Sequence, residues 1–138
     1  MLVRDVMAAD PVTISAEASL RETVQRMLAE GSTYVVVVDN DGNPGGFFTK
    51  DDVLQTMYQA ERPPADIRVI SVAEPPELTV DPSMEVREAA SQVTAENVSA
   101  ALVMDRLDFE GVFSVVDIVE HLGPILDATA AGEQVEQP

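Results

Sequence analysis

The chain has 138 residues, of which 46% are hydrophobic and 4% aromatic, so it is long enough for one compact domain or two small, closely packed units. It has no Cys and a single His, which excludes disulfides and thiolate metal sites and argues against a histidine-based zinc site or a Ser-His-Asp triad. With 25 Asp and Glu against 8 Lys and Arg, the net charge of −17 disfavours general binding to nucleic acids or anionic lipids.

The first half of the chain predicts the order strand, helix, strand, strand, helix. Ser19 and Glu22 form a capping-box pattern, and apolar residues from Leu20 to Leu28 then fall on one helix face until Gly31 ends the helix. The continuous β-branched run at 34–38 predicts a strand that is buried on both faces. In chain order, the expected elements are a strand at 12–14, a helix at 20–30, a strand at 34–38, a turn at 39–43, a strand at 47–48 and a helix at about 50–60, with Val53, Leu54, Met57 and Tyr58 facing inward.

The second half of the chain repeats this order. Residues 3–39 align with 69–105 without a gap at an offset of 66 (69 − 3), and Gly46 aligns with Gly111 at an offset of 65 (111 − 46). Asp81 followed by Pro82 predicts the start of a helix. The expected elements are a strand at 78–80, a helix with Val86, Ala90 and Val93 inward, strands at 100–104 and 112–113, and a helix at 115–122. The predicted division is a first repeat at 1–62, a linker at 63–68, a second repeat at 69–123 and a frayed tail at 124–138.

One motif closes each repeat, where a short strand enters a helix. Residues 46–52 and 111–117 each begin with Gly and place a hydroxyl residue, Thr49 or Ser114, three positions before a carboxylate, Asp52 or Asp117. A hydroxyl caps a helix N-terminus and a nearby carboxylate complements the helix dipole, so a purely structural cap explains each copy. A helix N-terminus is also a place where ligands bind, so a second interpretation, a cap that also contacts a ligand, stays open.

The repeated motif resembles the one that closes each repeat of the CBS domain pair, or Bateman module. The shared pattern is Gly-hydrophobic-Phe-(Thr/Ser)-x-x-Asp, and the segment from Val6 to Ile14, residues 20–22 and the Val-Val-Asp ending at Asp39 also fit. The resemblance covers about residues 1–122. It implies a mixed α+β fold in which two β-α-β-β-α repeats pack through their sheets with pseudo-twofold symmetry, leaving two clefts.

The resemblance also implies a function, which is the regulatory binding of adenosine compounds in those clefts and signalling to a partner protein. AMP, ADP, ATP and S-adenosylmethionine are the implied ligands, with no required cofactor, no metal site and no catalysis. Asp52 and Asp117 would hold the ribose hydroxyls, while Thr49 and Ser114 would approach the ribose or a phosphate. The implied ligand-binding residues are Val12, Thr13, Ile14, Tyr34, Val35, Thr49, Lys50, Asp52, Leu78, Thr79, Val80, Ala100, Ala101, Ser114 and Asp117.

The chain departs from the family pattern in ways that keep an alternative open. Val36 and Leu102 stand where the family usually has Pro, and positive charge for phosphates is sparse. Because Lys50 follows Thr49 whereas Val115 follows Ser114, the first site suits a polyphosphate better than the second. The alternative is a ligand-free scaffold that dimerises through its repeats. An enzyme is not expected, since no nucleophile-base pair or phosphate-binding glycine loop is present.

Charge and hydropathy also suggest the setting of the protein. Lys50 is the only Lys in an acidic chain, a composition that resembles proteins of salt-accumulating halophiles, so we expect a haloarchaeal source. No apolar run approaches the roughly 20 residues of a membrane span, and the first ten residues lack the apolar region of a signal peptide. We therefore expect a cytoplasmic homodimer that regulates a protein whose identity the sequence does not give.

Overall fold

The computed structural model describes residues 1–98, 100–121 and 123, which form two compact units. The first unit is Pro11–Pro76, and the second unit combines Met1–Asp10 with the described residues from Glu77 onward. The tail expected at 124–138 lies outside the described residues. None of the described helices is long and apolar enough to cross a membrane.

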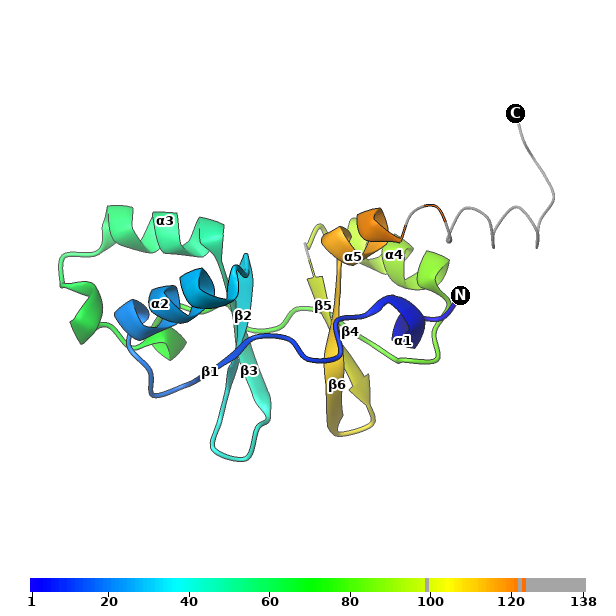
Figure 1. Ribbon diagram of the computed structural model, residues 1–138, viewed down its shortest axis with the longest axis horizontal. Coiled ribbons are helices and arrows are strands. Elements are labelled where there is room, and N and C mark those ends of the chain that lie inside the picture. The colour runs from blue at the N-terminus through cyan, green and yellow to red at the C-terminus, as the bar shows by residue number, and fades with distance from the viewer. Residues whose placement is uncertain (99, 122, 124–138) are drawn as a thin grey trace. The chain divides into compact units, whose positions relative to one another are not determined.

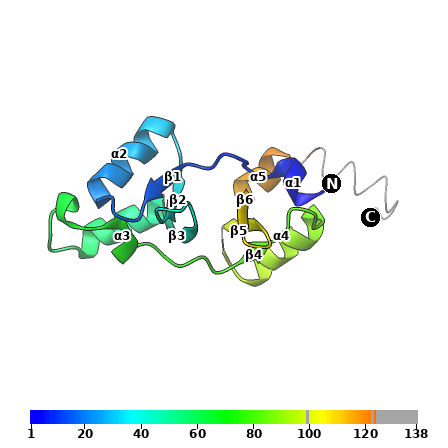
Figure 2. The same ribbon diagram turned by 90° about the horizontal axis from the view of Figure 1, so that it is seen from below.

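The first unit is a three-stranded sheet with two helices (Figure 1). Its sheet has the order β1-β2-β3, with β1 parallel and β3 antiparallel to the central β2. Figures 1 and 2 show α2 and α3 on the same side of this sheet. Its elements are β1 (Thr13–Ser15), α2 (Leu20–Glu30), β2 (Tyr34–Val38), β3 (Pro44–Thr49), α3 (Lys50–Gln59) and the 3-10 turns η1 (Pro64–Asp66) and η2 (Val69–Ser71).

The second unit repeats this arrangement, with a sheet of order β4-β5-β6 and the same parallel and antiparallel pairings. The predicted mixed α+β fold of two β-α-β-β-α repeats is thereby confirmed within each unit. The elements of the second unit are α1 (Val3–Val6), β4 (Thr79–Val80), α4 (Val86–Ala95), β5 (Ala100–Asp105), β6 (Asp108–Ser114) and α5 (Val115–Glu120).

Each unit has its own core of aliphatic residues and one Phe from the hairpin. Phe48 of β3 and Phe113 of β6 are both fully buried, each in the cluster that its unit's helices cover. Val35, Val36 and Val37 are fully buried as well, so the central strand is buried on both faces, as its β-branched run predicts. The cores form without Trp and with few aromatic rings, and Val is the residue that recurs most among their buried side chains.

The start and end of α2 follow the sequence prediction. The Ser19 hydroxyl accepts a hydrogen bond from the Glu22 N–H at 3.1 Å, and the Glu22 carboxylate accepts one from the Ser19 N–H at 2.9 Å. Gly31 ends the helix at φ 63°, a left-handed conformation in which Gly avoids the strain of a Cβ.

The predicted start of the equivalent helix in the second unit, α4, was wrong. Asp81 does not cap a helix, since α4 begins at Val86. The Asp81 carboxylate instead accepts hydrogen bonds from the N–H and hydroxyl of Ser83, which closes a tight turn before the helix. The Asp81 carboxylate therefore stabilises a local turn with Ser83 instead of capping a helix.

The predicted inward face of α3 was also wrong in part. Leu54, Met57 and Tyr58 are 69%, 51% and 90% exposed, and Leu28 of α2 is 74% exposed. Val53 packs against the core, as expected. Apolar periodicity indicates which residues share a helix face, but it does not show that the face is buried within the chain, and here part of it is exposed.

The segment that precedes the first strand of each sequence repeat packs in the unit formed mainly by the other repeat. Ala8, which precedes the first repeat's strand, exchanges two backbone hydrogen bonds with Val112 of β6 at 2.9 and 3.0 Å. Glu74, at the equivalent position before the second repeat, makes the same pair of bonds with Phe47 of β3 at 2.8 and 2.9 Å. The units therefore do not coincide with the predicted repeats 1–62 and 69–123, which remain a description of the sequence.

The paired glycines of the repeated motif allow this close approach. A Cβ at Gly46 would lie 3.1 Å from the Glu74 carbonyl oxygen, and a Cβ at Gly111 would overlap the carbonyl oxygen of Ala8. Neither glycine needs an unusual backbone angle, so each is explained by the strand that crosses it.

We expect Gly111→Ala to lower the free energy of unfolding by about 1–3 kcal/mol, because the methyl group must displace the Ala8 backbone. Gly45→Ala is the matched control, since its added Cβ would have no neighbour closer than 3.9 Å. Denaturant unfolding measures both variants. Equal stability of the two variants would contradict the explanation.

Candidate functional site

The N-terminus of α3 is closed by a reciprocal pair of hydrogen bonds between Thr49 and Asp52. The Thr49 hydroxyl accepts from the Asp52 N–H at 3.2 Å, and the Asp52 Oδ2 accepts from the Thr49 N–H at 2.9 Å. Thr49 has extended backbone angles, so its side chain turns back over the first helical turn. The predicted cap is confirmed, and the carboxylate belongs to it as a capping box.

The N-terminus of α5 has the same arrangement, built from Ser114 and Asp117. The Ser114 hydroxyl accepts from the Asp117 N–H at 3.3 Å, and the Asp117 Oδ2 accepts from the Ser114 N–H at 2.9 Å. The Ser114 hydroxyl also lies 3.0 Å from this Oδ2 and donates to it. In both caps the backbone fixes one carboxylate oxygen, while Oδ1 receives no hydrogen bond from any described residue.

The Asp117 carboxyl is partly buried, and this burial raises its pKa above the usual value. The hydrogen bonds from the Ser114 N–H and hydroxyl act in the opposite direction, as does His121, whereas Glu120 adds to the increase in pKa. The His121 Nδ1 lies 2.9 Å from the Asp117 carbonyl oxygen, near the end of α5. Burial outweighs the hydrogen bonds, so the fold disfavours the charged form of this carboxylate.

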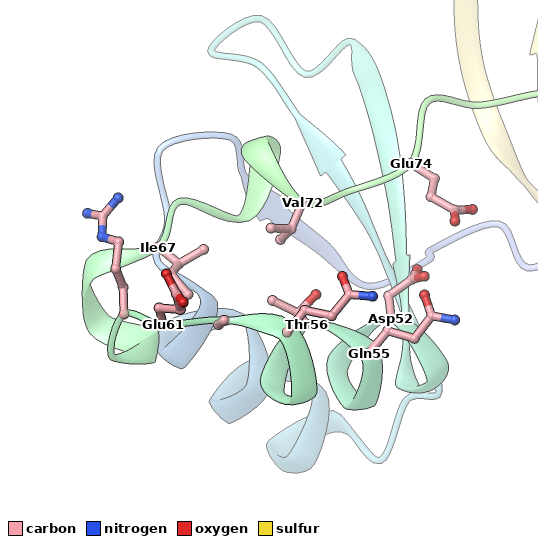
Figure 3. Close-up of a pocket in the computed structure, with 10 residues that line it drawn as sticks. Asp52, Gln55, Thr56, Glu61, Ile67, Val72 and Glu74 are labelled. Carbon is pink, nitrogen blue, oxygen red and sulfur yellow. The ribbon is translucent and has the colours of Figure 1, made fainter.

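A cavity of about 490 Å³ in the first unit has Asp52 in its wall. One side of the cavity is the polar face of α3, with Asp52, Gln55, Thr56 and Gln59 at the spacing of successive helical turns. Figure 3 shows Asp52 on α3 across from Val72 and Glu74 of the segment that follows η2. The remaining residues of the wall are Ala60, Glu61, Arg62 and Ile67.

Lys50 lies in the wall of a different cavity, although it is next to the cap in sequence. This second cavity, of about 410 Å³, lies between α2 and α3 and is lined mainly by apolar residues such as Val24, Met27 and Val53. Lys50 is not among the residues that line the cavity at Asp52. Its N–H is bonded to the Thr33 carbonyl oxygen at 3.0 Å.

Strand pairing brings several of the other predicted site residues to the caps. Tyr34 pairs with Thr49 across β2 and β3, and Ala100 pairs with Ser114 across β5 and β6. The strand segments Thr13–Ile14 and Thr79–Val80 lie on the opposite side of the central strand, with Val12 and Leu78 just before them. Among the predicted apolar wall residues, Val35, Val80 and Ala101 are buried in the cores, so their side chains serve packing.

The sequence prediction missed most residues that line the cavity at Asp52. Gln55, Thr56 and Gln59 follow Asp52 at i+3, i+4 and i+7, so their shared helix face was present in the sequence as a signal. No sequence spacing pointed to Glu74, because it precedes the second repeat in sequence and packs in the same unit as Asp52 through its pairing with Phe47. Among the described residues, no group of three His, Cys, Asp or Glu side chains is arranged to hold a metal ion.

Comparison with known proteins gives two curated relatives. The chain is 34% identical over 59 residues to the glycine betaine/carnitine/choline transport ATP-binding protein OpuCA of Bacillus subtilis, covering 43% of this chain but 16% of OpuCA. It is 26% identical over 132 residues to an uncharacterised protein of Methanopyrus kandleri, covering 95% of this chain and 67% of the relative. The chain therefore spans a small part of the transport protein and about two thirds of the archaeal one.

Solved structures share the fold of the chain at low sequence identity. A CBS domain protein of Pyrobaculum aerophilum, solved in complex with AMP, has a TM-score of 0.80 and 20% identity, covering 94% of this chain and 99% of its own. The CBS domain pair of protein MJ0100, solved with 5′-methylthioadenosine and S-adenosyl-L-methionine, has a TM-score of 0.78 and 20% identity, covering 89% of this chain and all of its own (100%).

The two sequence repeats also match a known family separately. The CBS domain matches this chain at residues 3–58 and again at residues 69–124. Both matches contain a complete Gly-to-Asp motif with its capping carboxylate. The chain therefore belongs to the CBS domain family and carries two CBS domains in tandem.

Proposed function

We propose that this CBS domain pair is a regulatory module that binds an adenosine-containing ligand through Asp52 and Asp117. The observation that carries the proposal is the state of these two carboxylates. Each has one oxygen fixed by a backbone N–H at 2.9 Å, while its Oδ1 accepts from no described residue. A carboxylate held in this way is oriented before the ligand arrives, which lowers the entropic cost of binding.

The ribose of an adenosyl ligand supplies the matching chemistry. Its two neighbouring hydroxyls are donors, and an ionised carboxylate accepts several hydrogen bonds and forms stronger ones than a neutral acceptor does. Thr49 and Ser114 would lie beside the ribose, with Tyr34 and Ala100 next to them across the sheet. The adenosyl ligands in the two related structures support this chemical class.

Regulation requires that the ligand prefer one arrangement of the chain or of its assembly, because a ligand with equal affinity for both shifts nothing. We propose that a partner protein reads this difference and that the module itself performs no catalysis. Turnover of ATP beyond the level of a contaminant in the purified protein would argue against the non-catalytic role.

An exposed apolar face favours assembly as a second function. Leu54, Met57 and Tyr58 are largely exposed, and their spacing places them on one face of α3. Exposed large apolar residues that cluster on a helix mark interaction surfaces. We propose that this face forms a homodimer, and a ligand-free scaffold would use the same face without any adenosyl compound.

For ligand binding, we expect Asp52→Asn and Asp117→Asn each to weaken an adenosyl ligand about 10-fold or more at the altered site, because a charged acceptor is lost. Asn keeps an acceptor for the cap N–H, so the helix start is preserved. Isothermal titration with AMP, adenosine and S-adenosylmethionine in molar potassium chloride measures the effect. Asp51→Asn is the control, since Asp51 is exposed and does not line the cavity. Binding that survives the double variant would contradict the assignment of the site.

For stability, we expect Asp117→Asn to raise the free energy of unfolding at pH 7. The pKa of Asp117 in the folded state lies above the usual 3.8, so ionisation of this carboxyl at neutral pH destabilises the folded state. Asn cannot ionise and avoids this cost. The stability gained by Asp117→Asn should therefore shrink as the pH falls toward 3.8. Asp81→Asn should act with the opposite sign, because hydrogen bonds from Ser83 lower the pKa of Asp81. Thermal unfolding between pH 4 and pH 7 compares them, and shifts of the same sign would refute the argument.

For assembly, we expect Leu54→Asp to raise the dimer dissociation constant about 10-fold or more, because it places a charge in an apolar contact. Leu107→Asp is the matched control, since Leu107 is 88% exposed but lies in the turn between β5 and β6. Sedimentation equilibrium measures both variants. A wild-type monomer, or equal effects of both substitutions, would exclude this face as the interface.

A further inference from the structure

We infer that the site at Asp52 selects adenosyl ligands whose 5′ group is neutral or cationic, such as a thioether or a sulfonium, over nucleotides with a 5′ phosphate. The inference rests on the proposed function, because it takes Asp52 as the carboxylate that holds the ribose. It departs from the sequence-based expectation that the first site suits a polyphosphate, and the titrations below distinguish the two.

The helix N-terminus beside Asp52 has few donors left for a phosphate. Anions bind helix N-termini through backbone N–H groups that have no partner inside the helix. Here the Thr49 N–H is bonded to the Asp52 carboxylate, the Asp52 N–H to the Thr49 hydroxyl, and the Lys50 N–H to the Thr33 carbonyl oxygen. Of the four N–H groups from Thr49 to Asp52, three are thus bonded within the fold, which leaves the Asp51 N–H as the donor for a phosphate.

The cationic side chain closest to Asp52 in sequence, Lys50, does not line the cavity at Asp52. Lys50 was the candidate for a phosphate contact, but it lines the mainly apolar cavity between α2 and α3. The other four basic residues of the first unit include Arg26 and Arg68, which are 3.9 and 3.3 Å from Glu30 and Glu17. Of the residues that line the cavity at Asp52, one is cationic, Arg62.

The wall of this cavity carries more negative than positive charge. Asp52, Glu61 and Glu74 supply three carboxylates against the single guanidinium of Arg62, whose Nη2 already donates to the Asp66 carbonyl oxygen at 2.6 Å. Figure 3 shows Asp52 and Glu74 at one end of the cavity and Glu61 at the other. A phosphate near the ribose would therefore meet like charge from Glu74.

Arg62 lies too far along the chain to offset this repulsion at the ribose. Asp52 is in the first turn of α3, and the seven residues to Gln59 rise about 10 Å along the helix axis. Arg62 follows beyond the end of that helix. Between them, Gln55, Thr56 and Gln59 line the cavity with neutral donors and acceptors. These suit an uncharged or zwitterionic extension of the ligand rather than an anionic one.

The test compares ligands that differ in charge at the 5′ position, using the full chain in the Asp117→Asn background to isolate the first site. We expect adenosine, 5′-methylthioadenosine and S-adenosylmethionine to bind at least 10-fold more tightly than AMP and ATP in isothermal titration. Adding Asp52→Asn should weaken the binding of each compound that binds by about 10-fold or more. We expect Glu74→Gln to strengthen AMP binding about threefold and to weaken S-adenosylmethionine binding.

The control for Glu74→Gln is Glu30→Gln, because Glu30 lies at the end of α2 and does not line the cavity. If AMP binds as tightly as adenosine and Asp52→Asn weakens both, the proposed function stands and the selectivity inference is overturned. If none of the five compounds binds to folded protein that retains Asp52, the proposed function fails at this site and the inference fails with it. Equal effects of Glu74→Gln and Glu30→Gln would overturn the role given to Glu74.

Discussion

The backbone contact between each hairpin and an incoming segment is the constraint on which the rest of the structure depends. Ala8 bonds to Val112, and Glu74 bonds to Phe47, each through two backbone hydrogen bonds beside a glycine. Because the incoming segment belongs to the other sequence repeat, each compact unit needs both repeats to be complete. The same incoming segments contain Val3 and Val69, which are buried in the two cores, and Glu74, which lines the cavity at Asp52. Core and candidate site therefore depend on one exchange of segments.

The capping carboxylates serve the fold and the proposed site with different oxygens. In a purely structural cap, the acceptor for the backbone N–H is sufficient, and a neutral amide could provide it. Asp117 instead keeps a carboxyl whose burial raises its pKa, so the fold gains less from this residue than from an exposed capping acid. A ligand that donates hydrogen bonds to the charged form would reverse that balance. Because Oδ1 receives no hydrogen bond from any described residue, the same carboxylate could hold the cap and, as proposed, a ligand.

The sequence predicted local elements well where the signal was local. The capping boxes at Ser19, Thr49 and Ser114 and the left-handed Gly31 follow from short-range chemistry, and the structure contains each of them. The exchanged segments could not be predicted from the repeat, because alignment at a fixed offset shows which residues are equivalent but not which unit they pack in. The inward face of α3 failed because periodicity does not distinguish a core from an interaction surface: Tyr58 keeps the helical spacing and is 90% exposed.

The position of the cavity bears on how a bound ligand would act on the rest of the chain. Val72 and Glu74 line the cavity and belong to the last residues of the first unit, just before the chain enters the second unit at Glu77. A ligand held between Asp52 and Glu74 would contact both the capped start of α3 and this connecting segment. Coupling needs a ligand that interacts differently with two states of such a segment, and a contact with Glu74 would be sensitive to its position. A cationic ligand would attract the Glu74 carboxylate and an anionic one would repel it, so under the proposed function the two classes of ligand would act on this segment in opposite directions.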